Sequence, residues 1–200
     1  MSTGYGSKKS EKMKNLNRFA ELARLGEAVF HSGDLANIWH ITNKNTLHTT
    51  IKRYVDRGLL FRIHKGFYSI KDPTLVDPLI LGLKALHSYA YVSTETVLRA
   101  AGIIQQEIPV ITLVSGKSSH FSIVGHQYYS RRLADKFLHQ PIGILVQAGG
   151  VRIASTERAV ADLLYFNKAA YFDLDRSIDW KSVREIQTAI GFPLTPKRYG

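Results

Sequence analysis

The segment from Asn43 to Asp56 combines two kinds of side chain at helical spacing. Apolar residues recur at intervals of three or four positions, at Leu47, Ile51, Tyr54 and Val55. This is the pattern of an amphipathic helix with one buried stripe. The opposite face carries amide, hydroxyl and basic groups and one carboxylate: Asn45, Thr46, Thr49, Lys52, Arg53 and Asp56. Lys44 and His48 lie on its flanks, and Asn43 precedes them. Such groups can hydrogen-bond to base edges and pair with phosphate oxygens, so these residues are candidates for contacts with DNA.

The flanking residues define the ends of this helix and the element before it. Asn43 or Asn45 can cap the first turn, and Gly58 stands where a helix commonly ends. A shorter helix is expected before it, with Asp34 as its N-cap and a turn over residues 41–43. Its buried side would be formed by Leu35, Ile38 and Trp39.

After Gly58 the period of the apolar residues changes to that of a strand. Residues 59–63 and 67–70 are expected to form two strands joined at residues 64–66, where Gly66 can supply a positive φ. The hairpin would carry Arg62, His64 and Lys65 within reach of a neighbouring phosphate. A first helix containing Leu16, Phe19, Ala20, Ala23 and Val29 is expected to cover the other two. The order helix, helix, hairpin predicts a winged helix-turn-helix over residues 14–72.

The charge of the chain is concentrated in its N-terminal part. The 200 residues contain 27 Lys and Arg against 16 Asp and Glu. Residues 1–72 hold 13 basic and 6 acidic residues, and residues 73–200 hold 14 and 10. Such an excess attracts polyanions in a salt-dependent way. Residues 1–13 form a polar, lysine-rich segment that we interpret as a flexible basic tail.

Prolines near residue 73 mark a boundary, after which helical and strand-like segments are mixed. Helices are expected over 78–87, from Ser93 to 101, after Ser155 or Thr156, and after Asp179 until Gly191. Strand-like segments are 110–114, 120–124, 127–130, 142–147 and 151–154. The prediction is an α+β domain over residues 73–200, in which helices flank a small, mostly antiparallel sheet.

The sequence offers little support for an enzyme, a cofactor or a metal site. The chain has no cysteine, which excludes disulfides and thiolate chemistry. Ser115–Ser118 resembles the end of a phosphate-binding P-loop, but that motif needs glycine where Ile111 stands. The histidines form no helical metal pair. No apolar stretch is long enough to span a bilayer, and we expect a cytoplasmic protein that is not an enzyme.

Five segments together resemble the AbiEi-type antitoxins of bacterial type IV toxin–antitoxin systems, which belong to abortive-infection (phage-defence) operons. The segments are DLANIW (34–39), NKNTLHTTIKRYVDRGLL (43–60), HKGFYS (64–69), YVSTETVL (91–98) and STERAVADLL (155–164). Their order extends the resemblance over about residues 15–190, nearly the whole chain.

This resemblance implies a two-part regulator. The winged helix would bind inverted repeats in its own promoter and repress the operon, with two copies on DNA and a monomer allowed in solution. The domain over residues 73–200 would counteract a nucleotidyltransferase-like toxin without a stable complex. The recognition helix would contain Asn43, Lys44, Asn45, Thr46, Thr49, Lys52 and Arg53, and the wing Arg62, His64 and Lys65.

Two other functions stay open. An ordinary winged-helix transcription factor would sense a ligand through an apolar pocket in residues 73–200. A DNA-targeted nuclease would need clustered carboxylates, for which Asp162, Asp173 and Asp175 are the candidates. The basic pairs at 131–132 and 197–198 (Arg131-Arg132 and Lys197-Arg198) could extend the contact with DNA or bind RNA.

Overall fold

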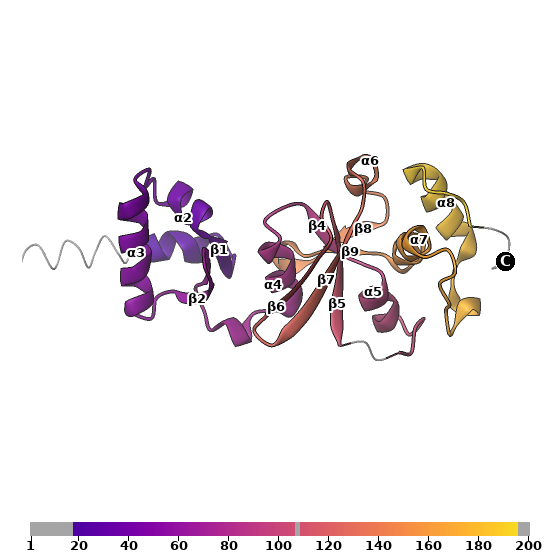
Figure 1. Cartoon of the computed structure of the whole chain (residues 1–200), viewed down its shortest axis with the longest axis horizontal. Helices are drawn as coiled ribbons and strands as arrows, with labels where there is room; N and C mark the ends of the chain where they lie inside the picture. Colours follow the sequence, from indigo (N-terminus) through magenta and orange to yellow (C-terminus); the bar gives the residue numbers. More distant parts are fainter. Residues whose placement is uncertain (1–17, 107–108, 196–200) are drawn as a thin grey trace, which may run out of the picture. The chain divides into compact units, whose positions relative to one another are not determined.

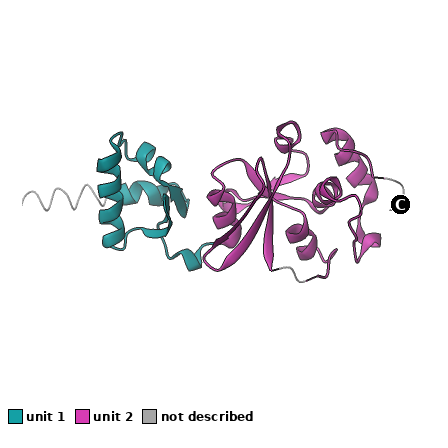
Figure 2. Ribbon diagram, in the orientation of Figure 1, with its two compact units in different colours: residues 1–76 teal, residues 77–200 magenta. Residues whose placement is uncertain are grey.

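A computed structural model describes residues 18–106 and 109–195. The chain divides into two units, residues 1–76 and residues 77–200 (Figure 2). The division follows Val76, a few residues after the boundary expected near Pro73. The expected basic tail over 1–13, Leu16 of the expected first helix, and the Lys197-Arg198 pair lie outside the described residues.

Unit 1 packs short helices against a three-stranded antiparallel sheet. Residues 18–24 are helical. They are followed by β1 (Val29–His31), α2 (Ser32–Ile38), α3 (Lys44–Asp56), β2 (Phe61–His64), β3 (Phe67–Ser69) and the 3-10 turn η1 (Pro73–Leu75). The strand order is β1-β3-β2, so β3 pairs with both other strands. The hairpin between β2 and β3 turns at Gly66, whose φ of +79° confirms the expected glycine turn.

The α3 boundaries follow the sequence signals, whereas two expectations nearby were wrong. The Asn43 side chain accepts a hydrogen bond from the Thr46 amide at 3.0 Å, and Gly58 follows the helix with a φ of +67°. Asp34 is not the N-cap of α2: it lies in the first turn and accepts from the His31 amide at 2.8 Å. Val29 is in β1 rather than in the first helix, because pairing with Ser69 provides its backbone partners.

Unit 2 is an α+β structure. Its helices are α4 (Pro78–Ala85), α5 (Glu95–Ala100), α6 (Asp135–Leu138), α7 (Thr156–Phe166) and α8 (Trp180–Ile190), with 3-10 turns η2 (Ala148–Gly150) and η3 (Asp175–Ser177). Its strands are β4 (Ala90–Val92), β5 (Val110–Ser115), β6 (Ser119–Ile123), β7 (His126–Arg132), β8 (Ile144–Val146) and β9 (Arg152–Ala154). Asp179 caps α8 and Gly191 ends it in the left-handed region, as expected.

The six strands form one mixed sheet in the order β6-β7-β5-β4-β9-β8. Helix α4 covers one face, and α5 and α7 lie on the other (Figure 1). The β5–β7 and β4–β9 ladders are parallel, and the other three are antiparallel. The expectation of a mostly antiparallel sheet therefore holds for three of the five ladders, and the two parallel ladders were not expected. Turn residues reveal hairpins, but they carry no signal for parallel pairing between distant segments.

Close packing of α4 against the sheet depends on a glycine. A Cβ atom at Gly82 would lie 2.4 Å from the Tyr128 ring, so α4 can approach β7 only without a side chain there. The Tyr128 hydroxyl donates to the Pro78 carbonyl at 2.9 Å, which fixes the start of α4. Burial, with the charge of Asp77, raises the pKa of Tyr128 to about 12.

A buried Arg158 connects α7 to the sheet and to the segment before β8. Its guanidinium donates to Asp162 Oδ1 at 2.9 Å, to the Tyr91 hydroxyl at 2.8 Å and to the Ile142 carbonyl at 2.7 Å. Arg158 and Asp162 are both fully buried. Burial and the nearby Asp162 carboxylate raise the pKa of Tyr91, so its hydroxyl stays neutral. A buried charge of this kind is tolerated only when its partners are in place.

Ser93 belongs to this network and is not the helix cap that we expected. Its hydroxyl donates to Asp162 Oδ2 at 2.7 Å. The N-cap of α5 is instead Thr94, which has a φ of +53°. That conformation is unfavourable for a β-branched residue and is maintained by the surrounding structure. The Ser93 side chain is thus used in a contact across 69 positions of sequence, which local pattern cannot predict.

We predict that Asp162→Ala destabilises unit 2 by about 3–5 kcal/mol, because it leaves the Arg158 charge buried and unpaired. Urea unfolding followed by Trp180 fluorescence in a Trp39→Phe background measures this change in unit 2. The double variant Arg158→Met/Asp162→Leu should recover most of the loss, since it removes both charges together. A loss below about 1 kcal/mol for the single variant would contradict the buried-charge account.

Candidate nucleic-acid interface

Helix α3 is oriented by its apolar stripe. Leu47, Ile51 and Tyr54 are buried in the core of unit 1 together with Leu35 and Trp39. The expected contact residues Lys44, Asn45, His48, Thr49, Lys52 and Arg53 are exposed on the rest of the helix surface. The helix therefore presents amide, hydroxyl and basic groups to solvent, which is the surface predicted from the spacing.

Two of the expected contact residues also have a local structural role. Asn43 Oδ1 accepts from the Thr46 amide at 3.0 Å and from the Thr46 hydroxyl at 3.3 Å. This pair closes the first turn of α3, and both side chains are exposed. A ligand that contacts Asn43 or Thr46 would therefore contact the helix cap itself.

The hairpin positions three further expected residues. Arg62 and His64 lie on β2, and Lys65 precedes the glycine of the turn. The pairing of β2 with β3 shifts register between Arg62 and His64. His64 lies with its ring centroid 5.1 Å from that of Phe67, and its Nδ1 is 3.1 Å from the Lys65 carbonyl. His64 is thus positioned by the hairpin.

A groove of about 530 Å³ separates α3 from the hairpin. It brings together four of the expected residues, His48 and Lys52 from α3 with Arg62 and Lys65 from the hairpin. The full lining is Ser32, His48, Ile51, Lys52, Val55, Asp56, Arg62, Lys65, Gly66 and Tyr68. Asn43, Lys44, Asn45, Thr46, Thr49, Arg53 and His64 do not line it.

Three polar members of this groove were not among the contact residues expected from the sequence. Ser32 begins α2, Asp56 ends α3, and Tyr68 lies on β3. The sequence shows that Asp56 lies one helical turn after Lys52. The position of Ser32 and Tyr68 beside α3 depends instead on the pairing of β1 with β3. The three cations Lys52, Arg62 and Lys65 outnumber the single carboxylate of Asp56. The groove therefore favours an anion.

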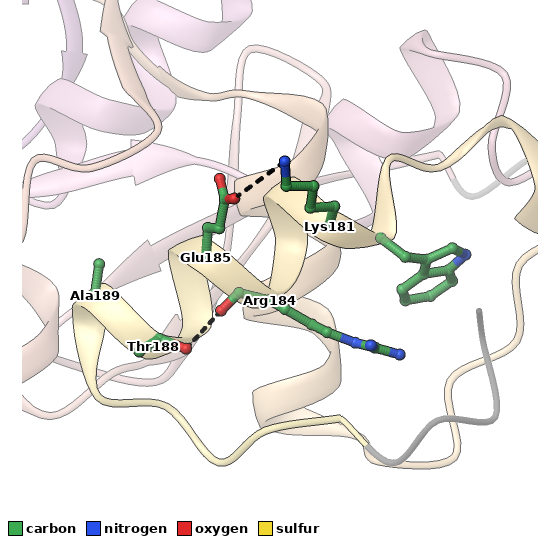
Figure 3. Close-up of a pocket in the computed structure, with 6 residues that line it drawn as sticks. Lys181, Arg184, Glu185, Thr188 and Ala189 are labelled. Carbon is green, nitrogen blue, oxygen red and sulfur yellow. Dashed lines mark hydrogen bonds and ion pairs between the residues drawn. The ribbon is translucent and has the colours of Figure 1, made fainter.

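The two other functions would need an apolar pocket or clustered carboxylates in unit 2. A hollow of about 630 Å³ lies along one side of α8, lined by Trp180, Lys181, Arg184, Glu185, Thr188 and Ala189 (Figure 3). It is a surface feature on a single helix and is not enclosed by the sheet. Asp162 is paired with Arg158, and Asp173 accepts from the Gln105 amide at 2.7 Å. Within the described residues, no three His, Asp or Glu side chains gather as a metal site would require.

In residues 18–106 and 109–195, no helix has the length and apolarity needed to cross a membrane.

Comparison with solved structures finds a similar fold in the RV2827C protein from Mycobacterium tuberculosis. The match has a TM-score of 0.51 and 11% sequence identity, and it covers 88% of this chain and 70% of that chain. This likeness concerns the fold alone. No protein-family model matches the sequence, and no curated protein matches it either.

We predict that Asn43→Ala destabilises unit 1 by about 1 kcal/mol, because the Thr46 amide loses its cap. The measurement is urea unfolding followed by Trp39 fluorescence in a Trp180→Phe background. Asn43→Asp should retain most of the stability, since a carboxylate oxygen can accept the same hydrogen bond. Equal destabilisation by both substitutions would show that the cap is not the reason.

Proposed function

We propose that unit 1 is a winged helix-turn-helix that binds DNA, and that the chain represses its own operon. The observation that carries this proposal is the groove in which Lys52 of α3 meets Arg62 and Lys65 of the hairpin. Cations from two separate elements line one groove there, beside a helix whose exposed face is polar. That arrangement suits a duplex, which presents base edges in the groove and phosphates on both sides of it.

The order of elements in unit 1 supports the same proposal. A helical segment, β1, α2 and α3 are followed by the β2–β3 hairpin, and β1 pairs with the second hairpin strand. In the winged helix-turn-helix this order makes the second helix of the pair the recognition helix. Here that helix would be α3, and the hairpin would be the wing.

The proposed mechanism divides the contacts by chemistry. Asn45 and Thr49 on the exposed face of α3 would read base edges in the major groove. Lys52, Arg62 and Lys65 would hold the flanking phosphates in the groove between α3 and the wing. Two copies would occupy an inverted repeat, one on each half-site, because a single unit reads only a short stretch of duplex.

We further propose that unit 2 gives the chain an antitoxin activity of type IV, directed against a nucleotidyltransferase-like toxin without a stable complex. The support is the resemblance of residues 91–98 and 155–164 to AbiEi-type antitoxins. These two segments supply all four side chains of the buried network, Tyr91, Ser93, Arg158 and Asp162. The resemblance thus covers the residues that hold the fold of unit 2 together.

DNA binding is tested on the duplex immediately upstream of the chain's own gene, over a salt series. We expect selective binding over a scrambled duplex, with each of Lys52→Ala, Arg62→Ala and Lys65→Ala lowering the slope of log K against log salt by about 1. Asn45→Ala and Thr49→Ala should instead reduce selectivity, because base contacts carry the sequence information.

The matched control is Lys168→Ala, which removes an exposed cation from unit 2. It should leave operator affinity within about twofold of wild type, since Lys168 belongs to neither α3 nor the hairpin. Binding that is equally strong on scrambled DNA would overturn the repressor proposal. Operator binding unaffected by all three groove variants would overturn the assignment of α3 and the wing.

The antitoxin proposal predicts that expressing this chain restores growth to cells poisoned by the toxin encoded beside it. Rescue should persist in the Lys52→Ala/Arg62→Ala/Lys65→Ala variant when both genes are driven by unrelated promoters, because unit 2 carries the activity. Co-purification of the two proteins as a stable complex, or absence of rescue, would contradict a type IV antitoxin.

A further inference from the structure

One end of the six-stranded sheet gathers basic residues from several segments. Strands β5 and β7 end there, as their Ser115–Arg132 pairing shows, and β4 begins there because Ala90 pairs with Ser115. Strand β9 runs parallel to β4, so its first residue, Arg152, lies toward the same end. The topology thus brings loop 116–118, Arg132 and Arg152 to one end of the sheet.

Side-chain contacts continue this surface across helix α6. The Arg132 amide donates to the Ser118 hydroxyl at 3.2 Å. A Cβ atom at Gly116 would lie 3.7 Å from Leu138 of α6, which places loop 116–118 against this helix. His139 directly follows α6, and its ring centroid is 4.9 Å from that of Tyr89.

We call this surface the basic end and define it by six residues. They are Lys117, Tyr89, Arg132, Lys136, His139 and Arg152. All except the half-buried Tyr89 are exposed. The carboxylate closest in sequence is Asp135, whose Oδ1 would lie 3.8 Å from a Cβ at Gly116.

The charges of the basic end are not neutralised within the described part of the chain. Lys117, Arg132, Lys136 and Arg152 form no ion pair with a described carboxylate. Elsewhere in unit 2, Arg131 is paired with Glu95 and Arg158 with Asp162. Four unpaired cations on one surface repel each other, and a bound polyanion removes that repulsion.

Aromatic rings hold two of these cations in place. The Arg152 guanidinium lies 4.9 Å from the Tyr89 ring centroid, and the Lys136 ammonium lies 4.5 Å from that of Phe137. Cation–π contacts of this kind restrict long side chains that would otherwise sample many rotamers. The cations therefore lose less conformational freedom when a ligand binds.

We infer that the basic end binds the phosphodiester backbone of a nucleic acid, as a contact separate from α3. Clustered Lys and Arg with interleaved aromatic rings are the footprint of proteins that bind nucleic acid through its backbone. The ligand chemistry is a run of phosphate monoanions, which single-stranded RNA, single-stranded DNA and duplex DNA share. The inference rests on unit 2 alone and does not require the DNA-binding assignment of unit 1.

The test uses the full chain carrying Lys52→Ala, Arg62→Ala and Lys65→Ala, so that binding of nucleic acid through the groove of unit 1 is weakened in every sample. Into it we introduce Arg132→Ala/Lys136→Ala/Arg152→Ala. The matched control is Lys168→Ala/Arg176→Ala/Lys181→Ala, which removes three exposed cations elsewhere in unit 2. The probes are labelled oligo(U), oligo(dT) and a random duplex, each about 20 nucleotides or base pairs long, which is enough to cover a typical binding site.

We expect the basic-end triple variant to bind at least one probe about tenfold more weakly than the control triple at low salt. Its salt slope should fall by about 2 to 3, because each lost phosphate contact contributes about 0.7–0.9. The probe whose affinity falls most identifies which kind of nucleic acid the basic end binds. Thermal unfolding of both triples should match the parent, since all six substituted side chains are exposed.

Equal losses in the two triple variants, or no loss in either, would overturn the inference. Failure of this inference is distinguishable from failure of the proposed operator binding. Operator binding is measured in chains whose basic end is intact, and it depends on the groove residues of unit 1. If the wild-type chain binds its operator selectively but the two triple variants bind the probes equally well, the proposed function stands and the second site is refuted.

Discussion

The burial of Leu47, Ile51 and Tyr54 determines which face of α3 meets solvent, and the candidate interface depends on that choice. Tyr54 is fully buried, with its ring centroid 4.9 Å from that of Trp39. Burial raises the pKa of its phenol, which keeps the side chain neutral in the core. Each such side chain contributes about 1.5–3 kcal/mol of burial free energy, so rotating α3 would be costly. The polar residues between these positions are consequently exposed.

The position of the hairpin beside α3 depends on strand pairing in the three-stranded sheet. Strand β3 pairs with β1 as well as β2, and Phe67 is buried with its ring stacked on His31 at 4.6 Å. The hairpin is therefore anchored to the segment that leads into α2. Arg62 pairs with Tyr68 through its backbone, whereas the side chains of Arg62 and Lys65 are exposed, so their charges are available to a ligand. Unit 2 separates its charges in a similar way: Arg158 holds the fold from inside, and the basic end lies outside.

Local signals in the sequence were sufficient for the elements of unit 1 that carry the proposed site. Asn43 marks the start of α3, Gly58 follows its end, and Gly66 forms the hairpin turn. These were predictable because caps and glycine turns depend on residues only a few positions apart. The short strands β1 and β4 were missed, since neither is joined to its partner strands by a glycine turn. The equally short β3, β8 and β9 were expected because each lies next to such a turn. The parallel ladders were missed because they join distant segments.

The same distinction applies to individual side chains. The candidate contact residues on α3 were predictable because exposure follows directly from helical spacing. Ser93 was interpreted as a cap, but its hydroxyl bonds to Asp162, a partner that only the folded sheet provides. Ser32 and Tyr68 of the groove, and the basic end of unit 2, likewise depend on strand pairing. Sites assembled from several segments are visible only once the register of the strands is known.

The central claim is that α3 and the β2–β3 hairpin form one DNA-contacting surface. Amide hydrogen exchange of the full chain, with and without its promoter duplex, tests this most directly. The account predicts new protection in peptides covering residues 44–56 and 61–69, with the core peptides around residue 35 unchanged. Binding of the duplex without added protection in either segment would contradict it.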